Sequence, residues 1–215
     1  MKNRGLFLSF EGSEGCGKST QIASLRQELQ SSGHNVVVLR EPGGTPLGEE
    51  IRHLLKHAVS GEGMCPESEL LLFSASRAQL VRQVIAPALA TPGTVVLADR
   101  FVDSTTVYQG IARGIPADTI TAINRLATNG VTPDTTFLLD LDVSESRTRL
   151  AARGETPDRL EREDDGFFQL VRNGYLELAR SEPRRFHVLD ASSPPESVQA
   201  AIRQHLRQRF HGLLP

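Results

Sequence analysis

The stretch LFLSFEGSEGCGKST, residues 6–20, decides the fold. A short apolar run, LFLSF (6–10), stops at Glu11 and leads into GSEGCGKS (12–19), which matches the pattern G-x-x-x-x-G-K-[ST]. In such a loop, glycines let backbone N–H groups converge on phosphate oxygens at a helix N-terminus, whose dipole favours anions. The stretch therefore predicts a phosphate-binding P-loop between a buried strand and a helix.

The loop predicts ATP and Mg²⁺ as cofactors. Lys18 is expected to reach the β- and γ-phosphates, and the hydroxyl of Ser19 is expected to bind Mg²⁺. The predicted nucleotide-binding residues are Gly12, Ser13, Glu14, Gly15, Cys16, Gly17, Lys18, Ser19 and Thr20. The alternative interpretation is a chance glycine-rich turn, which the flanking strand and helix argue against.

Along the rest of the chain, short β-branched runs alternate with long amphipathic segments. The predicted strands are 6–10, 35–39, 94–98, 136–141 and 186–190. The predicted helices are 18–32, 46–58, 66–91, 102–129 with a break near Gly114–Pro116, 143–153, 163–181 and 195–210. The strands are hydrophobic almost throughout, as strands buried on both faces must be. The pattern predicts an α/β, three-layer P-loop fold with a five-stranded parallel sheet covered by helices.

Composition narrows the class of protein. A chain of 215 residues fits one domain, 1–215, and its net charge of −2 argues against a broad basic surface for nucleic acid. The N-terminal apolar run is too short for a signal peptide or a membrane span. Cys16 and Cys65 form no CxxC pair, which favours a reducing setting. We therefore expect a cytoplasmic protein with no nucleic-acid or membrane partner.

The segment TVVLADR (94–100) has the form of a strand that ends in a magnesium-binding carboxylate, Asp99. Hydrolytic ATPases usually carry a glutamate next, whereas this chain has Arg100, and no NKxD-like guanine motif is present. A cation there suits an acceptor that is itself a phosphate, since a monophosphate is largely a dianion near pH 7 and requires no general base. The alternative role for Arg100 is a structural salt bridge.

A second source of positive charge is RTRLAARGETPDRLER (147–162). Arg149 and Arg153 are four residues apart, so a helix would place both on one face. We interpret residues 149–162 as a lid segment whose arginines close over the transferred phosphoryl group. The alternative is a solvated helix rich in arginine and glutamate.

Several segments in order resemble the thymidylate kinase family. They are FEGSEGCGKST (10–20), REPGGTPLGEEIR (40–52), LLLFSASRAQ (70–79), DRFVDSTTVYQG (99–110), ARGETPDRLE (152–161) and LDAS (189–192). The resemblance covers nearly the whole chain. It implies a nucleoside monophosphate kinase arrangement, transfer of the γ-phosphoryl group of MgATP to dTMP to give dTDP and ADP, and a cytosolic homodimer.

The resemblance also implies an acceptor site. Glu14 matches an acidic loop position near the acceptor, Phe73 matches the aromatic that stacks on thymine, and Arg77 matches the residue that reaches the base edge. Thr105 would bond the base and Tyr108 would lie near the sugar. The full set of expected substrate-binding residues is Glu14, Arg40, Pro42, Phe73, Arg77, Arg100, Thr105, Tyr108 and Gln109. From the residues alone, Phe73 and Tyr108 could equally be core, Arg77 a surface arginine, and the 40–44 segment merely a turn.

One departure concerns the catalytic cation. Some family members carry a basic residue in the phosphate loop, where this chain has Gly15, and the resemblance is then to the bacterial subclass that supplies the cation from the lid. Arg153 is the first choice. The expected catalytic residues are Lys18, Arg100, Arg153, Glu14 and Arg149.

Other functions stay open at the level of sequence. A kinase for other pyrimidine monophosphates is one, and a deoxynucleoside kinase is another. A deoxynucleoside acceptor would need a carboxylate base such as Glu11 or Glu14. A nucleotide-gated module or DNA-loading ATPase is the alternative from another class.

Overall fold

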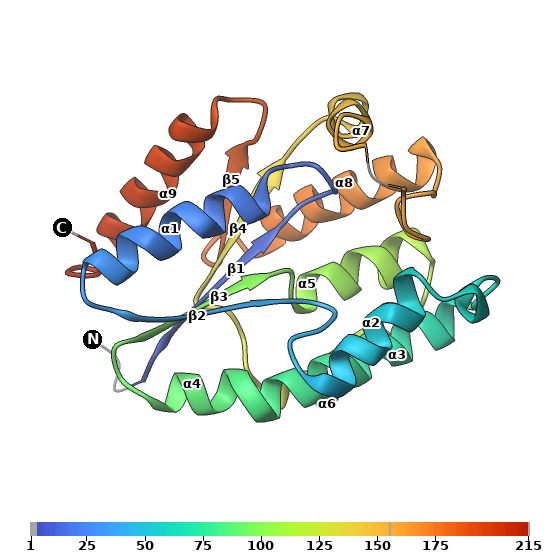
Figure 1. Ribbon diagram of the computed structural model, residues 1–215, viewed down its shortest axis with the longest axis horizontal. Helices are drawn as coiled ribbons and strands as arrows, with labels where there is room; N and C mark the ends of the chain where they lie inside the picture. Colours follow the sequence, from blue (N-terminus) through green and yellow to red (C-terminus); the bar gives the residue numbers. More distant parts are fainter. Residues whose placement is uncertain (1–3, 155, 215) are drawn as a thin grey trace.

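The computed structural model describes residues 4–154 and 156–214, and at its centre lies a five-stranded parallel sheet (Figure 1). The strands are β1 (Leu6–Glu11), β2 (Asn35–Arg40), β3 (Thr94–Asp99), β4 (Thr135–Asp140) and β5 (Phe186–Asp190). Their order in the sheet is β2-β3-β1-β4-β5, and every neighbouring pair is parallel. The predicted fold class is confirmed, and each predicted strand is present with ends within one residue.

Helices connect the strands. They are α1 (Lys18–Ser31), α2 (Pro46–Lys56), α3 (Pro66–Leu80), α4 (Ala86–Ala90), α5 (Val102–Thr105), α6 (Ala117–Thr128), α7 (Val143–Ala151), α8 (Asp165–Ser181) and α9 (Pro195–Arg209). A 3₁₀ turn, η1 (Val59–Gly61), and the π-helical segments η2 (Val81–Ile85) and η3 (Thr106–Ala112) complete the set. The break predicted near Gly114–Pro116 is confirmed, because the chain is irregular between η3 and α6.

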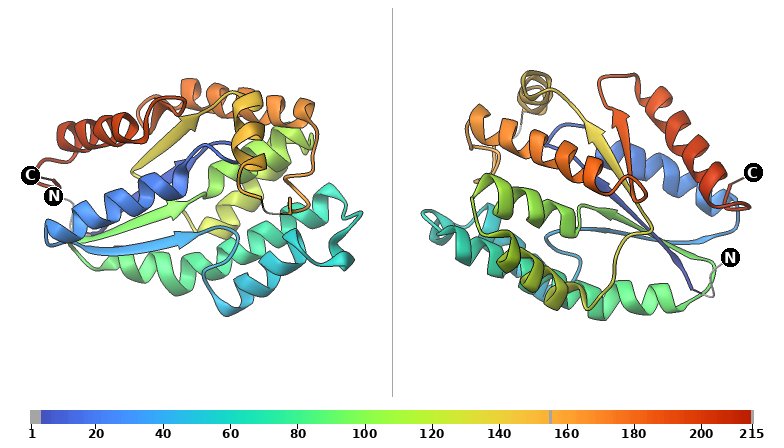
Figure 2. Two further views of the ribbon diagram at one scale, coloured as in Figure 1. Left: turned by 45° about the horizontal axis from the view of Figure 1, so that its top comes forward. Right: turned by 180° about the vertical axis from the view of Figure 1, so that it is seen from behind.

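The helices form layers on the two faces of the sheet (Figures 1 and 2). On one face, α1 and α9 pack against side chains such as Leu8 and Phe10 in a buried cluster. On the other, α3, α4 and α8 cover residues such as Phe7 and Leu138. Alternate strand residues thus face opposite layers and both faces are buried, which explains the continuous hydrophobic runs.

Three expected helices differ from the structure, and one of them, 102–129, is divided into α5, the π-helical η3 and α6. The segment 66–91 runs as α3, η2 and α4, so one continuous helix is interrupted by a π-helical turn. The helix expected over 143–153 ends at Ala151, where Arg153 N donates to Leu150 O and Gly154 takes φ 67°. Such tightening, followed by a left-handed glycine, is a common way for helices to end. No helix in the described part of the chain is long and apolar enough to span a membrane.

Candidate active site

The phosphate loop follows β1 directly and needs its glycines. Gly12, Gly15 and Gly17 take φ angles of 135°, 71° and 93°, values that side-chain-bearing residues rarely adopt. A Cβ atom at Gly12 would also lie 2.5 Å from the carbonyl oxygen of Leu139. Helix α1 begins at Lys18, immediately after the loop. The chain therefore presents the N-terminus of a 14-residue helix where the loop ends, as an anion-binding loop requires.

Two oxygen ligands suited to a magnesium ion lie beside this loop. The hydroxyl of Ser19 donates to Oδ2 of Asp99 at 3.0 Å. Hydroxyl and carboxylate oxygens are the donors that Mg²⁺ prefers, and its other ligands usually come from phosphate and water. Over residues 4–154 and 156–214 no group of three or more His, Cys, Asp or Glu side chains is placed to hold a metal. A cation shared between these two residues and a triphosphate therefore fits the site.

A cavity of about 480 Å³ lies beyond the carboxyl ends of β1, β2 and β3. It is lined by most of the predicted site residues: Glu14, Gly15, Gly17, Lys18, Ser19, Thr20, Arg40, Pro42, Phe73, Asp99, Arg100, Thr105, Tyr108, Gln109 and Arg153. Five predicted residues are not among its lining: Gly12, Ser13, Cys16, Arg77 and Arg149. The first three belong to the loop itself. The cavity thus joins the phosphate loop to the expected acceptor residues.

Arg100 connects the phosphate loop to the expected acceptor residues, because it contacts both Glu14 and Tyr108. Its φ is 71°, a left-handed backbone conformation that turns the chain sharply after β3. The guanidinium donates to Oε1 of Glu14 at 2.8 Å and to the hydroxyls of Tyr108 and Tyr175 at 3.3 and 3.2 Å. Burial disfavours its charge, but Glu14, Tyr108, Tyr175 and Glu11 together outweigh this effect and raise the pKa of Arg100. Arg100 is therefore a fixed cation at the centre of the site.

Glu14 is the anionic partner of Arg100. Burial alone would favour its neutral form, but Arg100, Lys18 and Lys56 outweigh burial and lower the pKa of the Glu14 carboxyl to about 2. Near neutral pH the group is thus a carboxylate and a weak base. Its role in this arrangement is to accept hydrogen bonds and hold Arg100.

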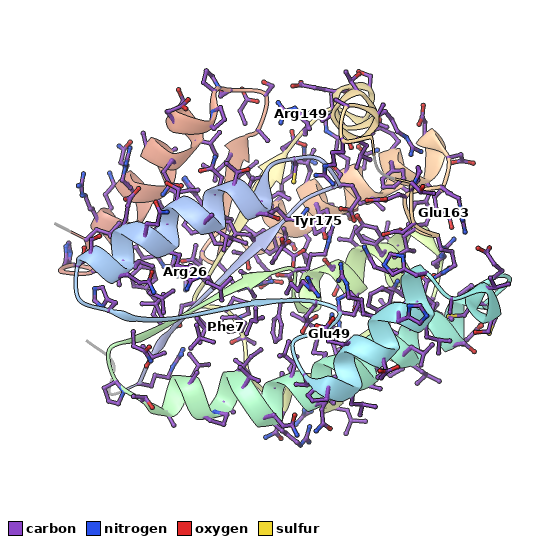
Figure 3. All side chains as sticks on the ribbon, in the orientation of Figure 1. Phe7, Arg26, Glu49, Arg149, Glu163 and Tyr175 are labelled. Carbon is purple, nitrogen blue, oxygen red and sulfur yellow. The ribbon has the colours of Figure 1, made fainter. Side chains whose placement is uncertain are left out.

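Glu11 lies in the protein interior next to the site and binds the residues that follow Arg100. It is fully buried, and its oxygens accept from Phe101 N, Ser104 Oγ and the hydroxyl of Tyr175 at 2.7–2.8 Å. Burial and the nearby Asp103 raise the pKa of Glu11 to about 7, although Arg100 opposes this. Figure 3 labels Tyr175, which reaches this cluster from α8. Because both oxygens of Glu11 are bonded and the residue does not line the cavity, it serves to hold the backbone after Arg100.

The expected acceptor residues face the cavity from α3, α5 and η3. Phe73 comes from α3, Thr105 ends α5, and Tyr108 and Gln109 lie on η3. Thr105, Tyr108 and Gln109 line the cavity but are at most 5% exposed, and η3, which carries the last two, packs against α8 and α3. A flat aromatic and neighbouring polar groups make a surface suited to a planar base.

Arg77 lies behind these residues. It is 1% exposed, pairs with Glu41 at 2.6 Å and donates to Thr105 Oγ1 at 2.8 Å. A third bond goes to the carbonyl of Phe101. Arg77 does not line the cavity, and its hydrogen bond orients the Thr105 hydroxyl from the protein interior. Glu41 does line the cavity, and among the described residues its Oε1 has no hydrogen-bond partner.

Cations from α2 add to the cavity, and the sequence reasoning missed them. Arg52 donates to the carbonyl of Pro42 at 2.9 Å, and Pro42 follows a cis peptide bond from Glu41. Lys56, four residues later, lines the same cavity, as does Arg40, which pairs with Glu49 at 2.9 Å. The spacing of Arg52 and Lys56 on one helix face was the available signal.

The lid segment corrects one expectation. Arg149 and Arg153 do not share a helix face, because α7 ends between them. Arg149 donates to Glu145 at 2.5 Å and to the carbonyl of Ala191 at 3.0 Å and is not among the residues that line the cavity, whereas Arg153 is. Figure 3 shows Arg149 beside α7. The segment is anchored to α2 by the ion pair of Lys56 with Asp158 at 2.5 Å.

A buried carboxylate that sequence reasoning also missed is Glu69, near the start of α3. It is 1% exposed and is bound by Gln109, Arg113 and the lid residue Arg159. Its partners are 40 or more positions away, so no local pattern marks it.

Comparison with known proteins agrees with this geometry. A sequence model described as thymidylate kinase matches residues 10–202. The thymidylate kinase of Deinococcus radiodurans is 49% identical over 97% of this chain and 100% of that protein. That of Geobacter sulfurreducens is 48% identical over 95% and 98%. The crystal structure of thymidylate kinase from Ehrlichia chaffeensis aligns with a TM-score of 0.74 and 34% identity, covering 94% of this chain and 98% of that one. With a match this long in both sequence and structure, the chain belongs to the thymidylate kinase family.

Proposed function

We propose that this protein transfers the γ-phosphoryl group of MgATP to dTMP, giving dTDP and ADP. The observation that carries the proposal is that one cavity is lined both by the phosphate loop and by Phe73, Thr105 and Gln109. Arg100 lines the same cavity. Family membership supports the choice of substrates.

The donor phosphates would bind the loop from Gly12 to Ser19. The backbone N–H groups hold the phosphate oxygens, and Lys18, which donates to the carbonyls of Ser13 and Gly12 at 2.9 and 3.3 Å, turns toward the β- and γ-phosphates. Ser19 and Asp99 would hold Mg²⁺. When bound, the ion neutralises charge on the β- and γ-phosphate oxygens.

The acceptor phosphate would lie near Arg100, with Arg40, Arg52 and Lys56 around it. These cations offset the repulsion between two anionic phosphates and align the attacking oxygen. Arg153, on the lid side of the cavity, would stabilise the charge that develops on the transferred group. The base would stack on Phe73, with Thr105 and Gln109 beside it and Tyr108 near the sugar.

The roles of the carboxylates argue against a nucleoside acceptor. Such an acceptor requires a base that takes a hydroxyl proton. Glu14, with its pKa held near 2 against the effect of burial by Arg100 and two lysines, is too weak a base. Glu11 is fully buried and bonded at both oxygens. A monophosphate acceptor needs neither.

The test is an assay of ADP release coupled to NADH oxidation, with dTMP, dUMP, dCMP and dAMP as acceptors and thymidine as a further one. We expect the highest kcat/KM with dTMP and no turnover of thymidine. Preference for another monophosphate would overturn the substrate and leave the phosphotransferase. Turnover of ATP stimulated by DNA, without a phosphorylated acceptor, would overturn both.

We further propose that residues 1–215 act as one kinase domain in a cytoplasmic homodimer that binds no nucleic acid. Exposed leucines on two packed helices, Leu71 of α3 and Leu126 of α6 (57% and 74% exposed), support a protein interface there. Light scattering of the purified protein should give twice the chain mass. Replacing both leucines with glutamate should give the monomer mass.

A further inference from the structure

Glu69 is a buried side chain that the proposed reaction does not yet use. It sits in the first turn of α3, one helical turn before Phe73, with 1% of its surface exposed. An isolated buried carboxylate is costly, so its partners must offset the loss of water. Those partners come from two separate parts of the protein, the acceptor site and the lid segment.

On the lid side, Arg159 forms an ion pair with Oε2 of Glu69 at 2.6 Å. The same side chain donates through Nε to the carbonyl of Leu55 at 2.9 Å, so it is held between α2 and α3. Arg113 bonds both oxygens of Glu69 at 3.2–3.3 Å and also pairs with Glu163 at 2.6 Å. The C-terminal part of the lid segment is therefore docked on this carboxylate.

On the acceptor side, Gln109 donates its Nε2 to Oε1 of Glu69 at 2.8 Å. Burial of Glu69 opposes ionisation, but Arg113, Gln109 and Arg159 together outweigh it and hold its pKa below the usual range, so the group is a carboxylate that only accepts. The amide of Gln109 must then turn its nitrogen to Glu69, which leaves its carbonyl oxygen for the cavity that Gln109 lines. A carbonyl oxygen there suits an N–H donor, and the base of dTMP has a single one, at N3.

We infer that Glu69 is a positioning residue of this enzyme. Its buried carboxylate orients the Gln109 amide toward the acceptor base, and it also holds the lid segment through Arg159. The inference rests on the proposed function, because it takes the cavity beside Phe73 as the acceptor site. An acceptor N–H on Gln109 would polarise the Gln109–Glu69 bond and so strengthen the contact chain that reaches Arg159. Acceptor binding and lid docking are thereby linked.

The experiment compares the whole enzyme with Glu69→Gln, which keeps the side-chain shape and removes the charge. A glutamine at this position lets the Gln109 amide rotate and abolishes the ion pair with Arg159, leaving at most a neutral hydrogen bond there. Calorimetric titration with dTMP in the absence of ATP should show a dissociation constant about 10-fold higher. Trypsin should cleave after the exposed Arg153 about 10-fold faster, and dTMP should slow that cleavage in the wild type but not in the variant.

The matched control is Glu163→Gln, which removes only the outer, more exposed partner of Arg113. It should change dTMP affinity and tryptic cleavage less than two-fold. A second variant, Arg159→Gln, removes the lid contact and leaves the Glu69–Gln109 bond. It should speed cleavage after Arg153 while raising the dTMP dissociation constant much less than Glu69→Gln does.

The outcomes separate this inference from the proposed function. Unchanged dTMP affinity and cleavage in Glu69→Gln would overturn the inference, as would equal losses in Glu163→Gln. If Glu69→Gln does not fold, Arg159→Gln decides, because unchanged cleavage in that variant contradicts lid docking on Glu69. A wild-type enzyme that leaves dTMP unphosphorylated would instead refute the proposed substrate.

Discussion

Lys18 is the residue that most directly tests the phosphate loop. Its ammonium lies within the loop, 2.9 Å from the carbonyl of Ser13, and is 7% exposed. Removing one preorganised cation from phosphoryl transfer costs about 10²–10³ in rate. We therefore expect Lys18→Ala to lower kcat by at least that range in the coupled assay. Circular dichroism and the melting temperature should stay near the wild-type values, since a loss of fold would make the comparison void.

Arg153 and Arg149 form a natural pair for the lid arginine, because one lines the cavity and the other does not. Arg153→Ala should lower kcat about 10-fold or more with a smaller change in the dTMP dissociation constant, since it acts on charge that develops during transfer. Arg149→Ala should reduce kcat less, because its guanidinium is bonded to Glu145 and Ala191. Equal kcat in the wild type and Arg153→Ala would remove Arg153 from the mechanism.

At the scale of elements, helix α8 carries Tyr175 into the site and depends on its N-cap. The side chain of Asp164 accepts from Phe167 N at 2.8 Å, which satisfies an otherwise unpaired helix donor. Asp164→Ala should lower the free energy of unfolding by about 1 kcal/mol in urea denaturation. The control is Asp165→Ala, whose carboxylate is 76% exposed in a pair with Arg147, and it should change that free energy by less than about 0.5 kcal/mol.

The elements themselves were largely predictable because their signals are local. Strands such as β3 read as hydrophobic runs since both faces are buried, and the P-loop glycines reveal the turn before α1. The end of α7 was predicted two residues late, because the sequence shows Gly154 but not whether a helix tightens before it. That small difference in one boundary separates Arg149 from Arg153 and so changes which arginine faces the cavity.

At the scale of the whole molecule, the contacts that complete the site join distant parts of the chain. Glu69 meets Arg159, and Lys56 meets Asp158 across 102 positions. No periodicity or motif specifies such pairs, because each partner alone reads as a solvated charge on a helix or loop. The sequence could therefore indicate the loop, Ser19 and Asp99 beside it, and most of the residues that line the cavity, while the anchoring of the lid required the fold.

A histidine pair between β5 and α9 makes the stability of the molecule depend on pH. His205 stacks on His187 with ring centroids 4.2 Å apart, and burial, followed by the charge of His187, lowers the pKa of His205 to about 4. The unfolded chain protonates this side chain below its ordinary pKa near 6.5, whereas the folded chain does so only near 4. The contribution of the neutral stack is thus fully present above pH 6.5 and declines as the pH falls toward 4.

The measurement is the difference in unfolding free energy between the wild type and His205→Phe, which keeps an aromatic ring against Phe137 and does not titrate. Groups that do not contact His205 cancel in this difference, including Glu11, whose raised pKa acts in the opposite direction. From pH 7 to pH 4.5 the wild type should lose on the order of 1 kcal/mol relative to the variant, allowing for partial exposure of the ring. His211→Gln, at an exposed position, is the matched control and should run parallel to the wild type. If the unfolding free energy of His205→Phe changed with pH in parallel with that of the wild type, the stacked pair would not account for the loss of stability below pH 6.5.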